Sequence, residues 1–82
     1  MFEIKFSDSA LKELTKLEKG LQERIIATLE RIRIRPESYV KRLVGDTAYR
    51  LRVGDYRILM DIQKEELIIL VIKIGHRSKV YN

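Results

Sequence analysis

Six residues in the second half of the sequence carry side chains suited to chemistry on a phosphodiester. They are Arg50, Arg52, Arg57, His76, Arg77 and Tyr81. Guanidinium groups bind a phosphate through two hydrogen bonds, an imidazole transfers protons near neutral pH, and an aromatic ring stacks on a base. These residue types together predict a site that binds a phosphodiester and stabilises the charge on it.

Three of the arginines fall on a predicted β-hairpin. Alternation places Arg50 and Arg52 on one face, and a two-residue turn at 54–55 places Arg57 directly across from Arg52. Like charges on paired strands repel each other, so this arrangement is unfavourable for stability unless an anion binds there. The alternative is that Arg50 and Arg52 pair with nearby acidic side chains at the surface, where each ion pair contributes about 0 to 1 kcal/mol.

The histidine and the tyrosine of this set have alternative roles. His76 follows a glycine at the end of a predicted strand, so it is either a proton-transfer group or an exposed turn residue. Tyr81 either stacks on a base or packs on the sheet as a C-terminal anchor. Tyr49 and Tyr56 alternate with apolar residues and are expected in the core.

The net charge of +5 is unevenly distributed. Residues 31–57 hold eight basic and three acidic residues, and residues 73–82 hold three basic residues and no acid. Seven of those eight bases are arginine, whereas a face that needs only solubility has no reason to prefer arginine to lysine. A solvated face is the simpler interpretation, but the choice of arginine favours a polyanion or an acidic protein as partner.

Length and composition exclude several classes of protein. A chain of 82 residues forms one domain, 1–82, and buries only roughly 60% of its unfolded surface, which excludes a large enzyme with its own cofactor domain. The sequence has no cysteine for a disulfide or thiolate site and one histidine, so we expect no metal and no cofactor. The longest apolar run, Leu67–Ile72, is too short to span a bilayer, and the N-terminus lacks the apolar segment of a signal peptide. We therefore expect a cytoplasmic protein without membrane contact.

The hydrophobic pattern predicts one strand, two helices and three further strands. Period-two alternation or a continuous apolar run marks each strand, and helical periodicity marks each helix, with Gly20 closing the first helix and Pro36 ending the second. The predicted elements cover residues 2–6, 10–17, 21–32, 49–53, 56–62 and 67–74. This order, β-α-α-β-β-β, predicts an α+β fold: a small, mostly antiparallel β-sheet with an N-terminal helical hairpin packed on one face.

The last predicted strand, LIILVIKI at 67–74, is apolar on both faces. This pattern is typical of a central strand that is covered on both sides. The helical hairpin covers one side, and the sequence offers no obvious element for the other. We therefore expect an apolar groove there that is open to a partner.

Two stretches, KRLVGDTAYRLRVGDYRILMDI and VIKIGHRSKVYN, resemble the RelE/ParE superfamily of toxin-antitoxin systems, especially its RelE-type members. The helical hairpin and basic linker before them follow the same order, so the resemblance covers essentially the whole chain. It implies a microbial toxin that a cognate antitoxin neutralises. It also implies metal-independent cleavage of mRNA in the ribosomal A site, in which the RNA 2′-OH attacks the adjacent phosphate and leaves a 2′,3′-cyclic phosphate and a 5′-OH.

The resemblance also implies roles for individual residues. Arg50 and Arg52 resemble the paired basic residues on the family's catalytic strand, and Arg57 resembles the arginine that steadies the phosphate. Arg77 resembles the arginine of the tail, and Tyr81 the tyrosine that stacks on a base.

This sequence departs from the best-known RelE pattern at the paired basic residues, which are lysines there. Arg50 and Arg52 stand at these positions, and a guanidinium group is a poor proton acceptor. We therefore expect both arginines to stabilise charge, which leaves His76 as the side chain for proton transfer near neutral pH.

Three functions are compatible with the sequence. The first is a ribosome-dependent mRNA endoribonuclease whose partners are an antitoxin, the ribosome and mRNA, and the joint presence of His76, Arg77 and Tyr81 favours it. The second is a ParE-type gyrase inhibitor that acts by binding, and the third is an inactive relative that only binds an antitoxin. We expect an acidic, partly helical antitoxin segment to cover the basic site.

Overall fold

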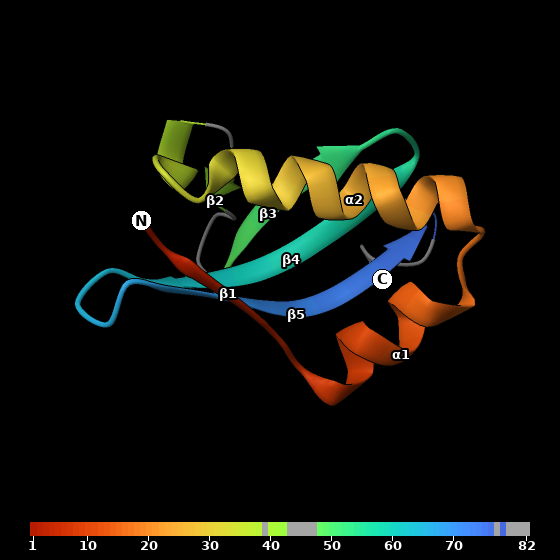
Figure 1. The fold of residues 1–82 in the computed structure, drawn as a ribbon, viewed down its shortest axis with the longest axis horizontal. Helices are drawn as coiled ribbons and strands as arrows, with labels where there is room; N and C mark the ends of the chain where they lie inside the picture. The colour runs from red at the N-terminus through yellow and green to blue at the C-terminus, as the bar shows by residue number, and fades with distance from the viewer. Residues whose placement is uncertain (39, 43–47, 77, 79–82) are drawn as a thin grey trace.

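The computed structural model describes residues 1–38, 40–42, 48–76 and 78. Its strands and helices, in chain order, are β1 (Glu3–Phe6), α1 (Asp8–Lys16), α2 (Lys19–Ile32), a 3-10 helix (Pro36–Ser38), β2 (Lys41–Arg42), β3 (Tyr49–Val53), β4 (Tyr56–Gln63) and β5 (Ile68–His76). The strands form one sheet in the order β1-β5-β4-β3-β2 (Figure 1). Among the described strands, β1 and β5 alone pair in parallel, so the predicted α+β fold with a mostly antiparallel sheet is confirmed.

The two helices begin at different kinds of N-cap. Ser7 caps α1 because its Oγ accepts a hydrogen bond from the backbone N of Ala10 at 3.0 Å. The extended backbone of Glu18 starts α2, so Gly20 lies in the first turn of α2 and the prediction that it closes the first helix is wrong. Glycine keeps its backbone N–H and C=O groups, so it can continue a helix, at a cost in conformational entropy of about 0.5 to 1 kcal/mol relative to alanine.

Both helices cover the same face of the sheet. Helix α1 packs on β5 and β1, and α2 packs against β3 (Figure 1). Alternate residues of the three long strands meet the helices there and form one buried cluster with them. The buried residues are Ala10, Leu14, Ile25, Leu29, Ile32, Leu51, Val53, Ile58, Met60, Ile62, Ile69, Val71 and Ile74.

An irregularity in β5 changes which of its residues face the helices. Met60 of β4 pairs with Val71, whereas the preceding residue Leu59 pairs with Lys73, so Ile72 is an extra residue in β5. Such a β-bulge shifts the alternation of the strand by one position. Ile74 is consequently buried under the helices, and Lys73 lies on the opposite face with Leu59.

The face of the sheet that points away from the helices, called the open face here, is partly apolar as predicted for β5. Ile68 and Leu70 of β5 and Leu59 of β4 are half-buried on this face. Within residues 1–38, 40–42, 48–76 and 78, no helix or strand packs over it. The same part of the chain holds no helix long and apolar enough to cross a membrane.

Candidate functional site

Three of the predicted site residues lie together on the open face. Arg50 and Arg52 alternate along β3 with buried residues, and Arg52 is the direct partner of Arg57 on β4. The expected two-residue turn at Gly54 and Asp55 joins the strands, and Gly54 supplies its left-handed backbone with a φ of 59°. We call Arg50, Arg52 and Arg57 the arginine face.

The strand register places the positive charge at one end of the open face. One row across the sheet holds Arg52, Arg57 and Gly75, and the next holds Arg50, Leu59 and Lys73. Asp61 pairs with Leu70 one row further on, where Gln63 Nε2 donates a hydrogen bond to its Oδ2 at 3.2 Å. An anion therefore meets mainly cationic side chains near the β3–β4 turn.

The arginines differ in their burial. Arg57 is half-buried and its Nη1 atom is excluded from solvent, whereas Arg52 is exposed and its Nε donates to the carbonyl oxygen of Gly54 at 3.3 Å. Within the described part of the chain Arg52 makes no ion pair, so it lacks the surface pairing considered as its alternative role. Partial burial lowers the local dielectric constant, which strengthens the electrostatic interactions of Arg57.

His76 lies on the other side of the sheet from the arginine face. It is the last residue of β5 and pairs with Tyr56, and the two rings meet edge to face with centroids 5.5 Å apart. Its Nδ1 lies 3.0 Å from the Oγ of Ser78 and accepts a hydrogen bond from the Ser78 backbone N at 3.3 Å. The bulge at Ile72 explains this position, because uninterrupted alternation from Val71 would put His76 on the open face.

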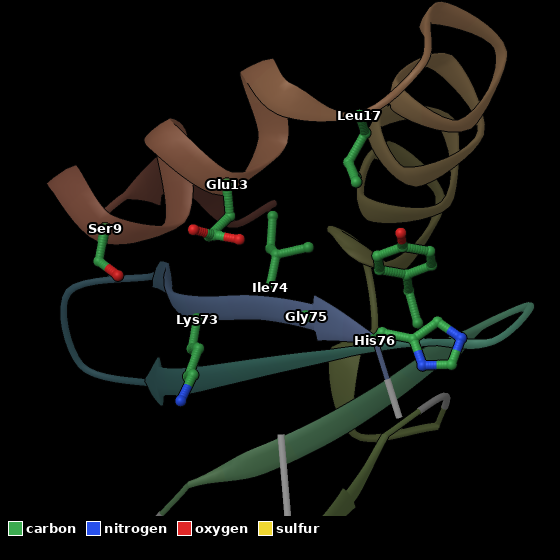
Figure 2. Close-up of a pocket in the computed structure, with 8 residues that line it drawn as sticks. Ser9, Glu13, Leu17, Lys73, Ile74, Gly75 and His76 are labelled. Carbon is green, nitrogen blue, oxygen red and sulfur yellow. The ribbon is translucent and has the colours of Figure 1, made fainter. Parts of the chain in front are cut away.

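A pocket of about 350 Å³ separates α1 from the end of β5. It is lined by Ser9, Glu13, Leu17, Tyr56, Lys73, Ile74, Gly75 and His76 (Figure 2). Ser9 and Glu13 extend from α1 toward β5, while Lys73 points away from α1 (Figure 2). Glu13 also pairs with Lys16 at 3.7 Å. None of the three residues of the arginine face lines this pocket.

The remaining site predictions have different outcomes. Arg77 and Tyr81 lie outside the described residues, and their roles stay predictions. Tyr49 and Tyr56 pack against the core, as expected. Lys73 was missed, because simple alternation from Val71 assigns it to the helix side, and only the register opposite Leu59 places it on the open face. Among the described residues, no three His, Asp or Glu side chains are grouped as a metal site.

Comparisons with known proteins agree over nearly the whole chain. The family model described as the ParE toxin of the type II toxin-antitoxin system parDE matches residues 4–81. An Escherichia coli protein described as a RelE-like toxin is 34% identical over 86 residues, which cover 99% of this chain and 90% of that protein.

Two solved structures from Escherichia coli share the fold. The toxin chain of the intact RelBE toxin-antitoxin complex superposes with a TM-score of 0.81 and 25% identity, covering 93% of this chain and 96% of that chain. The isolated RelE toxin superposes with a TM-score of 0.79 and 26% identity, covering 99% of this chain and 92% of that chain.

Proposed function

The chain belongs to the RelE/ParE family of type II toxin-antitoxin toxins, and from this premise we propose that it is a ribosome-dependent mRNA endoribonuclease. The observation that carries the proposal is the arginine face, which gathers three guanidinium groups on the open side of the sheet. Like charges on directly paired residues repel, so Arg52 opposite Arg57 is an unfavourable pair by itself. It becomes favourable when a phosphate lies over the pair.

The proposed reaction is cleavage of the RNA backbone by its own 2′-OH. The 2′-oxygen loses its proton and bonds to the adjacent phosphorus, the bond from phosphorus to the 5′-oxygen breaks, and the 5′-oxygen takes up a proton. Negative charge grows on the phosphate oxygens in the transition state, and preorganised cations near these oxygens lower the barrier. The half-buried Arg57 is best placed for this stabilisation, and Arg50 and Arg52 hold the flanking phosphates. The reaction as proposed uses no metal or cofactor.

The tail residues complete the proposed site. By the family pattern, Arg77 adds a cation and Tyr81 stacks on a base of the substrate. Proton transfer by His76 requires its ring to reach the arginine face, whereas the ring packs on Tyr56 on the helix side. We therefore assign charge stabilisation to the arginines and give His76 no role in the proposed reaction.

We propose that an antitoxin controls this site by covering the open face. The Escherichia coli toxin that superposes with a TM-score of 0.81 was solved in complex with its antitoxin. In this chain the half-buried Leu59, Ile68 and Leu70 adjoin the arginine face, so an amphipathic segment with acidic side chains finds both apolar and cationic contacts. Native mass spectrometry of the chain co-expressed with its genetic neighbour tests this, and recovery of free monomer alone contradicts it.

A second candidate function is inhibition of gyrase by binding. The match of residues 4–81 to the ParE toxin family favours it, because ParE-type toxins use the same scaffold without cutting RNA. A cationic face that stabilises a transition state and one that only binds a partner have the same residue types. The two functions therefore differ in their products and must be separated by experiment.

Expression of the chain from an inducible promoter in Escherichia coli tests the proposal. We expect growth arrest together with discrete cleavage of transcripts, detected by primer extension. Arg57→Ala and Arg77→Ala relieve the arrest, because each removes a cation from the proposed site. Lys12→Ala, an exposed change on α1, is the control and leaves toxicity intact.

Three outcomes contradict the proposal. Full toxicity of both arginine variants removes the site assignment. Growth arrest with DNA damage and intact transcripts supports gyrase inhibition instead. Wild-type expression without any growth arrest indicates an inactive relative.

A further inference from the structure

Arg24 of α2 lies against the turn that joins β3 and β4. Its Nη1 and Cζ atoms are 3.3 and 3.8 Å from the position that a Cβ atom would occupy on Gly54. The turn sits beside α2 in the fold (Figure 1). Because Gly54 has no side chain, the guanidinium group of Arg24 fits into the space that a side chain would occupy there. The sequence pattern gave no reason to link Arg24 with the arginines of the hairpin, 26 or more positions later.

Arg52 reaches the same glycine from the open face. Its Nε donates to the Gly54 carbonyl oxygen at 3.3 Å, and its strand partner is Arg57. Guanidinium groups from both sides of the sheet therefore converge on the tip of one hairpin. The turn itself supplies a single acidic residue, the exposed Asp55, so positive charge dominates at the tip.

Arg24 is available for a partner. Its side chain is exposed, and in the described part of the chain it forms no ion pair. Placing its charge close to Arg52 is unfavourable in the free protein and is relieved by an anion that contacts both. Arg24 and Arg52 thus form a second pair of neighbouring like charges at the turn, as Arg52 and Arg57 do on the open face.

Neither β3 and β4 nor the turn between them carries a large, exposed apolar side chain of the kind that anchors a protein partner. The large exposed apolar side chains of the described residues are Met1, Leu11, Ile26, Ile34, Leu67 and Ile72. None of them belongs to β3, to β4 or to the turn between them. Protein interfaces are centred on buried apolar and aromatic residues, whereas nucleic-acid backbones are bound mainly through arginine and lysine. The composition therefore favours RNA over an acidic protein at this tip.

We propose that Arg24 extends the arginine face around the Gly54–Asp55 turn and binds the phosphate backbone of the RNA on which the protein acts. The inference rests on the proposed function, since it names a further contact to the same class of partner. A flexible phosphate chain passes over the convex tip and contacts Arg52 on one side of the sheet and Arg24 on the other. Arg24 thereby positions the RNA, and the reacting phosphate stays on the arginine face.

The test compares two exposed arginines of α2. Arg24→Gln removes the cation at the turn. Arg31→Gln removes a cation that lies two helical turns further along the same side of α2, about 10 Å away. Binding of a labelled single-stranded RNA oligonucleotide is measured by fluorescence anisotropy over a series of salt concentrations. Thermal unfolding of each variant checks that the fold is retained.

Arg24→Gln is expected to weaken RNA binding about threefold to tenfold. It also lowers the slope of log K against log salt by about 0.7, the value for one lost phosphate contact on a single strand. Arg31→Gln is expected to change affinity less than about twofold, because it alters only the long-range field.

Equal effects of the two variants overturn the inference, as does a wild-type protein that fails to bind the oligonucleotide at low salt. The inference is also overturned if Arg24→Gln weakens binding to poly-glutamate as much as binding to RNA, because the tip is then a general anion site. A separate assay of mRNA cleavage distinguishes this failure from that of the proposed function. If the wild type does not cleave but Arg24→Gln still selectively loses RNA binding, the cleavage proposal fails and the Arg24 inference stands.

Discussion

The repulsion between Arg52 and Arg57 gives a prediction about stability that does not depend on the substrate. The two residues are direct partners on antiparallel strands, so their Cβ atoms are about 5 Å apart. Two unit charges separated by about 8 Å repel by about 0.5 kcal/mol in water, and by more where they lie closer or the surroundings are less polar. Removing one charge should therefore stabilise the free protein.

Two variants of Arg52 isolate this charge. Arg52→Gln removes it and Arg52→Lys keeps it, and both lose the 3.3 Å hydrogen bond from Nε to Gly54. At low salt the Gln variant is expected to exceed the Lys variant in free energy of unfolding by about 0.5 kcal/mol, which raises the melting temperature by about 2 to 4 °C in a domain of this size. Urea unfolding followed by circular dichroism measures the difference.

Salt supplies the control for this prediction. The screening length falls to about 3 Å at 1 M salt, so the difference between the Gln and Lys variants should disappear there. A Lys variant that is equally or more stable than the Gln variant at low salt would refute the reasoning. That result would mean that the charge of Arg52 is compensated in the free protein and that the arginine face needs no anion.

Two further predictions concern the elements that position the site. Ser7→Ala should lower the free energy of unfolding by about 1 to 2 kcal/mol, because Ser7 caps α1 and its Oγ donates to the carbonyl of Ile72 at 2.7 Å. Urea unfolding measures this loss, with a change at the exposed Ser9, Ser9→Ala, as the control. An equal effect of the two variants contradicts the capping role of Ser7. Gly54→Ala should lower the free energy of unfolding by about 1 kcal/mol, because Gly54 has a φ of 59°. Gly20→Ala should instead stabilise α2 by about 0.5 to 1 kcal/mol, since no atom lies within 4 Å of the added methyl group. Thermal unfolding measures both, and a lower melting temperature for Gly20→Ala than for Gly54→Ala refutes this prediction.

The sequence was sufficient to predict the arginine face because only local rules are involved. Strand alternation and a two-residue turn at Gly54 place Arg50, Arg52 and Arg57 on one face, and the structure has this register. The helical stripes were equally clear, since both are bounded by polar residues. Gly20 was misplaced because a glycine marks a helix end only when its backbone is left-handed, and at this position it continues α2.

The position of His76 was not predictable from the sequence pattern. The run from Leu67 to Ile72 is apolar at every position, so it contains no polar residue that would reveal where the alternation shifts. The bulge at Ile72 then decides that His76 lies on the helix side. The position of Arg24 was not predictable for another reason, because its proximity to Gly54 depends on how α2 packs over the sheet. The two-residue strand β2 is too short to produce any periodic signal.

Cleavage of a defined mRNA on programmed ribosomes tests the central claim most directly. The purified chain is added to ribosomes stalled with a known codon in the A site, and the RNA fragments are analysed by primer extension and mass spectrometry. We predict one cut within that codon, a 2′,3′-cyclic phosphate on the upstream fragment, and loss of the cut with Arg57→Ala. Intact mRNA together with inhibition of gyrase supercoiling by the same preparation would contradict the account.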